Sequence, residues 1–200
     1  MKNLGTMDRL LRVILAELCI LVAFFWASEE WQIPLYLIAG VMLIQAARGS
    51  CGFYSLLGWN SCELIKRKEK NSKTIFVATV LVLAVVGGYA SSVLTKNIFL
   101  EDLGDVSEAY SLVLQSSGEG NRENATEEFG ELERTFVDFR QKYSKYRPLT
   151  IKFDGNYTAQ MNNISEAISG SKEEIYQGNL SLGHQELKKA EPTIQIMLKR

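Results

Sequence analysis

The sequence predicts an all-α membrane protein, in which a transmembrane hairpin and a third transmembrane helix lead into an extracytoplasmic up-down four-helix bundle. Three observations indicate this class: three long apolar stretches in the first half, helical spacing of apolar residues in the second, and a change of charge between the halves. We expect residues 1–72 to form the hairpin and its cytoplasmic extension, 73–95 the third span, and 96–200 the bundle.

The three apolar stretches cover residues 10–27, 33–47 and 74–94. A spanning helix needs about 20 residues at 1.5 Å each. The third stretch meets this length without an internal charge, the first is close to it, and the second is shorter. Because only residues 28–32 separate the first two stretches, we expect a tight helical hairpin.

The distribution of Lys and Arg predicts the orientation, because cytoplasmic segments are enriched in them. Residues 1–100 contain ten Lys and Arg against six Asp and Glu, a net charge of +4, whereas residues 101–200 contain twelve against seventeen, a net charge of −5. The basic residues of the first half flank the hairpin, whose tip carries only Glu29 and Glu30. We therefore expect a multi-pass protein of the cell (inner or cytoplasmic) membrane, with a cytoplasmic N-terminus and residues 96–200 outside.

A cleaved signal peptide is the competing interpretation of residues 1–27. Two residues oppose it: Glu17 interrupts the apolar region, and Phe25 would occupy the −3 position of a cut after Ala27. Small residues are required at that position, so we expect the first stretch to remain in the protein.

Two short segments flank the predicted hairpin: NLGTMDRLLR at 3–12 and CGFYSLLGWNSC at 51–62. Together they resemble the YgaP-like inner-membrane domain, a small two-helix domain found alone or fused to other modules. The resemblance covers about residues 1–66 and implies a membrane hairpin. The chain departs from the family pattern at Gly52, where Pro is usual, and at Glu17, where small residues are favoured.

Cys51 and Cys62 bracket the second segment on the predicted cytoplasmic face, where thiols stay reduced. One interpretation is a thiol pair that passes sulfur or senses redox state, with Arg48 and Lys66 lowering a thiol pKa. The other is that both are small packing residues at the membrane boundary. Their spacing matches neither a CxxC redox motif nor a zinc site.

Glu17 is an ionisable residue inside the first apolar stretch, which makes it a functional candidate by default. An ion pair with Arg12 is one arrangement that would stabilise it. The alternative to a transport role is a structural pair near the cytoplasmic edge, which we favour because three spans and one carboxylate make a poor transporter.

The third apolar stretch carries small residues at four-residue spacing, Ala84, Gly88 and Ser92. Such a face lets membrane helices approach closely. It suits a homo-oligomer, a larger membrane complex, or packing on the hairpin equally well.

The second half shows apolar residues at alternating steps of three and four, as amphipathic helices do. Breaks between helices are expected at 117–121, 148–154 and 178–179, and these short links predict antiparallel neighbours. Asn124 with Glu127 fits a helix N-terminal cap, and Pro192 is expected to kink the last helix. The aromatic residues of the second of these helices would either fill a dry core or line a pocket.

Four N-x-S/T sequons lie in the second half, at Asn124, Asn156, Asn163 and Asn179. Their placement fits an extracytoplasmic domain that is glycosylated. The alternative is that Asn simply occurs at helix caps and turns.

No catalytic, cofactor or metal site is expected. The second half has no Cys for a covalent haem, and one His in the chain excludes a di-metal Glu-x-x-His pair. Nucleic-acid binding is not expected of an acidic domain. We therefore expect a non-enzymatic membrane protein, in contact with the lipid bilayer, whose bundle binds a partner or ligand. The alternatives are a thiol or sulfur relay through Cys51 and Cys62, or an accessory subunit of a larger membrane complex.

Overall fold

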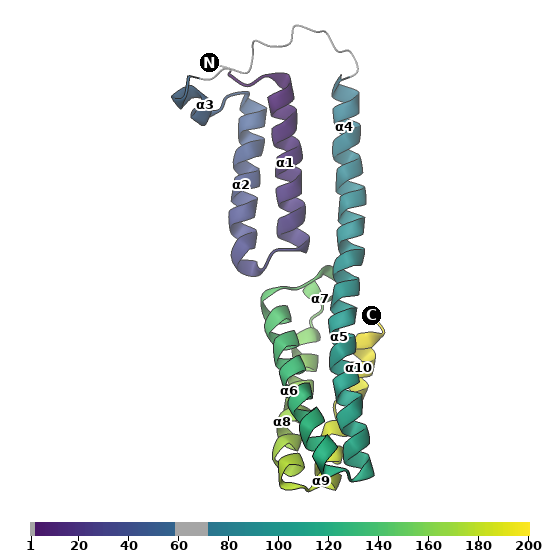
Figure 1. The fold of residues 1–200 in the computed structure, drawn as a ribbon. Coiled ribbons are helices and arrows are strands. Elements are labelled where there is room, and N and C mark those ends of the chain that lie inside the picture. The colour runs from purple at the N-terminus through teal and green to yellow at the C-terminus, as the bar shows by residue number, and fades with distance from the viewer. Residues whose placement is uncertain (1–2, 59–71) are drawn as a thin grey trace. The chain divides into compact units, whose positions relative to one another are not determined.

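The computed structural model describes residues 3–58 and 72–200, and within these ranges every regular element is a helix. The expected all-α class is therefore confirmed. The chain divides into two compact units, Met1–Val93 and Leu94–Arg200. Figure 1 shows the helices of each unit in order along the chain.

The first unit is built around two antiparallel helices, α1 (Thr6–Phe25) and α2 (Glu29–Arg48), followed by the short α3 (Gly52–Leu56). α4 (Ser72–Val82) and the π-helical turn η1 (Leu83–Gly87) follow, and α5 (Gly88–Glu119) starts in this unit. α1 and α2 lie side by side (Figure 1), and their buried residues are mostly alanines, which let the two backbones approach closely.

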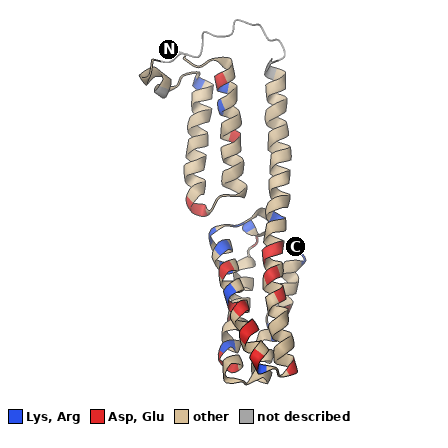
Figure 2. Cartoon of the chain, viewed as in Figure 1, with Lys and Arg blue, Asp and Glu red and all other residues tan. Residues whose placement is uncertain are grey.

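Two helices of the described chain are long and apolar enough to cross a membrane: Glu29–Arg48 and Thr74–Glu119. Figure 2 shows the uncharged middle of α2 between acidic residues at one end and Arg48 at the other. α1 is equally long, but it carries four charged residues: Asp8, Arg9, Arg12 and Glu17. The three expected spans therefore reduce to two helices that meet this criterion and one charged helix packed against α2.

The second unit consists of the later part of α5 with α6 (Arg122–Lys145), α7 (Leu149–Lys152), α8 (Tyr157–Gln177), α9 (Leu180–Lys188) and α10 (Glu191–Leu198). One continuous core of buried apolar residues joins these helices. Its largest fully buried side chains come from several helices and include Phe99 of α5, Leu132 and Tyr143 of α6, Ile164 of α8 and Leu187 of α9. The apolar spacing of three and four residues turns these positions toward one interior.

Two expectations about helix ends in this unit are wrong. The N-cap of α6 is Asn121, whose side chain accepts a hydrogen bond from the backbone of Asn124 at 3.3 Å, so Asn124 lies inside the helix. Pro192 does not kink one long helix, because α9 ends at Lys188 and Pro192 occupies the first turn of a separate helix, α10. Proline suits that position, since its missing N–H would have no partner there.

Candidate functional site

The strongest concentration of polar contacts in the first unit lies where α2 ends. The last carbonyls of any helix lack partners within the helix. In α2 they are satisfied from outside: Gly49, with a left-handed φ of 68°, donates its N–H to Gln45 O at 2.9 Å. Arg9 donates from Nε to Ala46 O at 2.6 Å and from a terminal nitrogen to Ala47 O at 3.4 Å. A cation at this end also complements the helix dipole.

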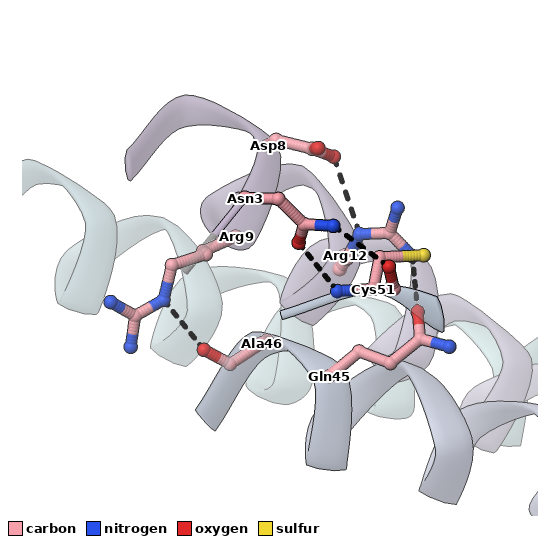
Figure 3. Close-up of polar contacts among 7 residues, drawn as sticks. All are labelled: Asn3, Asp8, Arg9, Arg12, Gln45, Ala46 and Cys51. Carbon is pink, nitrogen blue, oxygen red and sulfur yellow. Dashed lines mark hydrogen bonds and ion pairs between the residues drawn. The ribbon is translucent and has the colours of Figure 1, made fainter. Parts of the chain in front are cut away.

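Asn3 joins the N-terminal segment to the segment after α2 by a two-way pairing (Figure 3). Its Nδ2 donates to Cys51 O at 2.9 Å, and the Cys51 N–H donates to its Oδ1 at 2.8 Å. The backbone N–H groups of Asn3 and Leu4 both donate to Gly49 O at 3.2 Å. The two segments that carry the family resemblance are therefore bonded directly to each other.

Arg12 gathers three further groups at the same end of the hairpin. It donates to Gln45 Oε1 at 2.5 Å and pairs with Asp8 at 3.3 Å, and its guanidinium carbon lies 5.3 Å from the ring centre of Tyr54. Figure 3 shows Arg12 between Asp8 and Gln45. The contact with Gln45 links α1 to the end of α2, the contact with Tyr54 links α1 to α3, and the Asp8 pair lies within α1. Through Arg12 the N-terminal motif therefore has a structural role in closing this end of the hairpin.

Cys51 is 3 % exposed, and its backbone groups are both paired with Asn3. A thiol that passes sulfur must be reached by a donor and an acceptor, so this burial favours the packing interpretation. Cys62 lies outside the described residues, and the expected thiol pair is therefore represented here by Cys51 alone.

The expected ion pair between Glu17 and Arg12 is not formed in the described structure. Arg12 pairs with Asp8 instead, and Glu17 Oε2 is buried without a hydrogen-bond partner among the described residues. The reason is geometric: residues five apart on a helix point about 140° away from each other at 3.6 residues per turn, whereas residues four apart share a face.

The small residues of the third apolar stretch do not form one buried face in the described structure. Ala84 is exposed, whereas Gly88 and Ser92 are half-buried. The close approach occurs at Gly87, where an added Cβ would lie 3.0 Å from Leu21 Cδ1 of α1. The π-turn Leu83–Gly87 changes the direction in which successive side chains point, which four-residue spacing alone does not reveal.

All four sequon asparagines are exposed: Asn124, Asn156, Asn163 and Asn179. Asn156 is the N-cap of α8. Asn163 accepts a hydrogen bond from Thr193 Oγ1 at 2.9 Å, and Asn179 donates to Glu174 Oε2 at 2.8 Å. Two of the amides thus have local structural partners, and the remaining two lie at or near a helix start.

The aromatic residues of α6 fill a core rather than line a pocket. Phe129, Phe136, Phe139 and Tyr143 are at most 4 % exposed. Tyr143 donates its hydroxyl to Asp102 Oδ2 at 2.5 Å, and burial together with this bond raises the pKa of Tyr143 above its usual value. Burial likewise raises the pKa of Tyr157 to about 12.

A shallow hollow lies on the surface of the second unit where α6 starts and α8 ends, lined by Arg122, Glu123, Thr126, Glu127 and Tyr176. Arg122 donates to Tyr176 O at 3.0 Å across it. The exposed ring of Tyr176 packs edge-to-face on Phe129, with ring centres 5.7 Å apart. No sequence motif indicated this hollow, because its residues come from two helices far apart in the chain.

Among the residues that the structure describes, no three His, Cys, Asp or Glu side chains are grouped to hold a metal ion. His184 is half-buried, and its Nδ1 lies 3.1 Å from Leu114 O and 3.2 Å from Ser117 Oγ. A carbonyl partner requires Nδ1 to carry the proton. This histidine is therefore bonded into the contact between α9 and α5.

Residues 1–64 match the family model described as the inner membrane protein YgaP-like, transmembrane domain. The match confirms the resemblance indicated by the segments at 3–12 and 51–62. With the two helices long and apolar enough to span, it places the chain in a membrane. Comparisons with curated proteins and with solved structures found no match.

Proposed function

We propose that this chain is a non-enzymatic, membrane-anchored protein that presents residues 96–200 outside the cytoplasm as an up-down four-helix bundle, for binding a partner or a small ligand. The supporting observation is the continuous core of the second unit, to which α5, α6, α7, α8, α9 and α10 all contribute buried residues. A unit with its own packed interior at the end of an apolar stretch is built to be displayed by a membrane anchor.

The extracytoplasmic side is supported by charge. Lys and Arg gather before the first apolar stretch and between residues 48 and 73, whereas residues 101–200 carry a net charge of −5. Positively charged loops are retained in the cytoplasm, and the domain beyond the third stretch then lies on the other side.

The hollow between α6 and α8 supports a surface site for recognition, since the interior of the unit is filled. It combines an exposed aromatic ring, Tyr176 at 41 %, with both signs of charge at Arg122, Glu123 and Glu127. Interfaces favour aromatic and arginine side chains of this kind. A polar peptide or protein partner fits this chemistry better than an apolar small molecule.

The experiment is photo-crosslinking in the native membrane. We place a photoreactive amino acid at Thr126, in the hollow, and at Gln195, an exposed position of α10, as the matched control. The proposal predicts a discrete adduct at Thr126 that disappears in Tyr176→Ala and is absent at Gln195. Equal adducts at both positions, or none at Thr126, would contradict it.

A second candidate is an accessory subunit of a larger membrane complex, joined through the third apolar stretch, residues 74–94. The supporting observation is that apolar side chains of this segment are exposed in the described structure, including Ile75 at 65 % and Val85 at 68 %. Lipid or another membrane helix would cover them. Gly88→Leu is expected to abolish co-purification with such a complex and to leave the crosslink at Thr126 unchanged.

A further inference from the structure

Positive charge collects at one end of the Leu94–Arg200 unit. Four Lys and Arg and no Asp or Glu lie between residues 142 and 153, in a domain that is acidic overall. Figure 2 shows basic residues where α6 ends and α7 lies, and acidic residues along much of the remaining helix surface. Two carboxylates near this end form ion pairs, Asp102 with Lys142 at 2.5 Å and Asp154 with Arg200.

Arg147 is suited to an acceptor from outside the protein. Its guanidinium carbon lies 5.9 Å from the ring centre of Tyr157, and its Nε is buried without a hydrogen-bond partner among the described residues. A guanidinium group binds two oxygens of a phosphate through paired, charge-assisted hydrogen bonds.

Phe153 supplies an apolar group beside these cations. It follows α7 and is 78 % exposed, more than the other exposed large apolar side chains of the second unit, while Ile151 two residues earlier is fully buried. An aromatic ring next to basic residues is the pattern of segments that lie in the headgroup region of a bilayer.

This basic end is also the end at which the chain enters the unit. Thr95, directly after the apolar stretch 74–94, is bonded to the hydroxyl of Tyr146. Phe99 packs on Tyr143 with ring centres 4.9 Å apart, and on Tyr157 with ring centres 6.5 Å apart. By chain connectivity, the residues around Tyr146 are therefore those nearest to the point where the third span leaves the membrane.

We propose that Lys145, Arg147, Lys152 and Phe153, which we call the basic collar, dock on anionic phospholipid headgroups of the bilayer that residues 74–94 cross. Phosphate groups bind the cations, and the Phe153 ring inserts among the headgroups. This docking requires only that residues 74–94 span the membrane. It depends neither on the side on which the second unit lies nor on any partner that the unit binds.

The test is hydrogen–deuterium exchange of the full chain in nanodiscs of phosphatidylcholine with and without phosphatidylglycerol. We expect exchange of backbone amides at 146–156 to slow only with the anionic lipid, by on the order of fivefold for each engaged Lys or Arg. High salt is expected to remove the protection because it screens these charges. Equal exchange in both lipids would overturn the proposal.

Two variants and a matched control separate docking from folding. Lys145→Gln/Arg147→Gln/Lys152→Gln is expected to abolish the lipid-dependent protection. Phe153→Ser is expected to weaken the protection, because it removes the ring that inserts among the headgroups. That side chain is 78 % exposed, so its loss is expected to leave the fold intact. Arg134→Gln/Lys172→Gln/Lys188→Gln removes the same charge elsewhere in the unit and is expected to keep the protection. If the control variant lost the protection to the same extent, the basic collar would not be the docking surface. The same conclusion would follow if the lipid protected the 178–179 turn equally strongly.

Discussion

Asn3 and Cys51 hold each other through paired hydrogen bonds of 2.9 and 2.8 Å, in which the side-chain amide of one meets the backbone of the other. Forty-eight residues and two helices separate them in the chain. This pairing closes the hairpin at the end where the carbonyls of α2 need partners, and it gives both motif segments a structural role.

Asn3→Ala is expected to destabilise the hairpin, because it leaves the partly buried N–H and C=O groups of Cys51 without their side-chain partner. We expect a loss of about 1–3 kcal/mol in the free energy of unfolding. We measure denaturant unfolding of the full chain in detergent, and use the protection of backbone amides at 6–48 against hydrogen–deuterium exchange as the readout. Asn3→Asp keeps the acceptor for the Cys51 N–H and is expected to lose less. Equal stability of all three proteins would show that the pairing contributes nothing.

The thiol of Cys51 is expected to react slowly with maleimide in the folded protein and rapidly after unfolding, because it is 3 % exposed. Peptide mass spectrometry after timed labelling gives both rates, and half-buried Cys19 is the internal comparison. Fast labelling of Cys51 under native conditions would contradict this prediction. Either that result or added sulfur on Cys51 in protein from native membranes would support the sulfur-relay hypothesis.

Gly183→Ala is expected to destabilise the second unit, since a Cβ there would lie 2.6 Å from Cγ1 of the fully buried Ile175. Overpacking of this kind costs typically about 1–3 kcal/mol. The matched control is Gly104→Ala in α5, where a Cβ meets nothing within 4 Å. That variant is expected to stabilise the helix by roughly 0.5–1 kcal/mol. Unfolding followed by circular dichroism compares them, and equal effects would contradict the packing described.

Alkaline pH is expected to unfold the second unit through its buried tyrosines. Burial raises the pKa of Tyr143 and of Tyr110 above the usual value of 10.0. Above pH 10 the unfolded chain releases these protons while the folded chain retains them, so stability is full below pH 10 and falls as pH rises further. Circular dichroism and phenolate absorbance at pH 9 and 11 measure this. Tyr143→Phe is expected to lower stability at pH 9 and to reduce its fall at pH 11, and an unchanged pH dependence would contradict the assignment.

Periodicity and apolar length were enough to predict the all-helical class and the position of most helices. The helix ends followed less directly from sequence. Both Asn121 and Asn124 suit an N-cap, and only the position of the turn after Glu119 selects Asn121. Pro192 fits either a kinked helix or the first turn of a new one, and the break after Lys188 decides for the latter.

The sequence predicted the two motif segments of the candidate site, but not the hydrogen bonds that join them. The contacts of Asn3 and Arg9 join residues at least 37 apart in sequence, and no local pattern encodes them. The Glu17–Arg12 pair failed because Asp8 lies on the same face of α1 as Arg12, whereas Glu17 does not. Likewise the π-turn moved the close contact of the third stretch to Gly87.

Labelling of cells with a membrane-impermeant maleimide determines whether the protein is anchored with residues 96–200 outside the cytoplasm. We use Gln195→Cys and Lys68→Cys in a chain whose own cysteines are replaced by Ser. We expect Gln195→Cys to be labelled in intact cells and Lys68→Cys only after permeabilisation. Labelling of Lys68→Cys alone in intact cells would contradict the orientation, and extraction of the protein from membranes by alkaline carbonate would contradict the anchor.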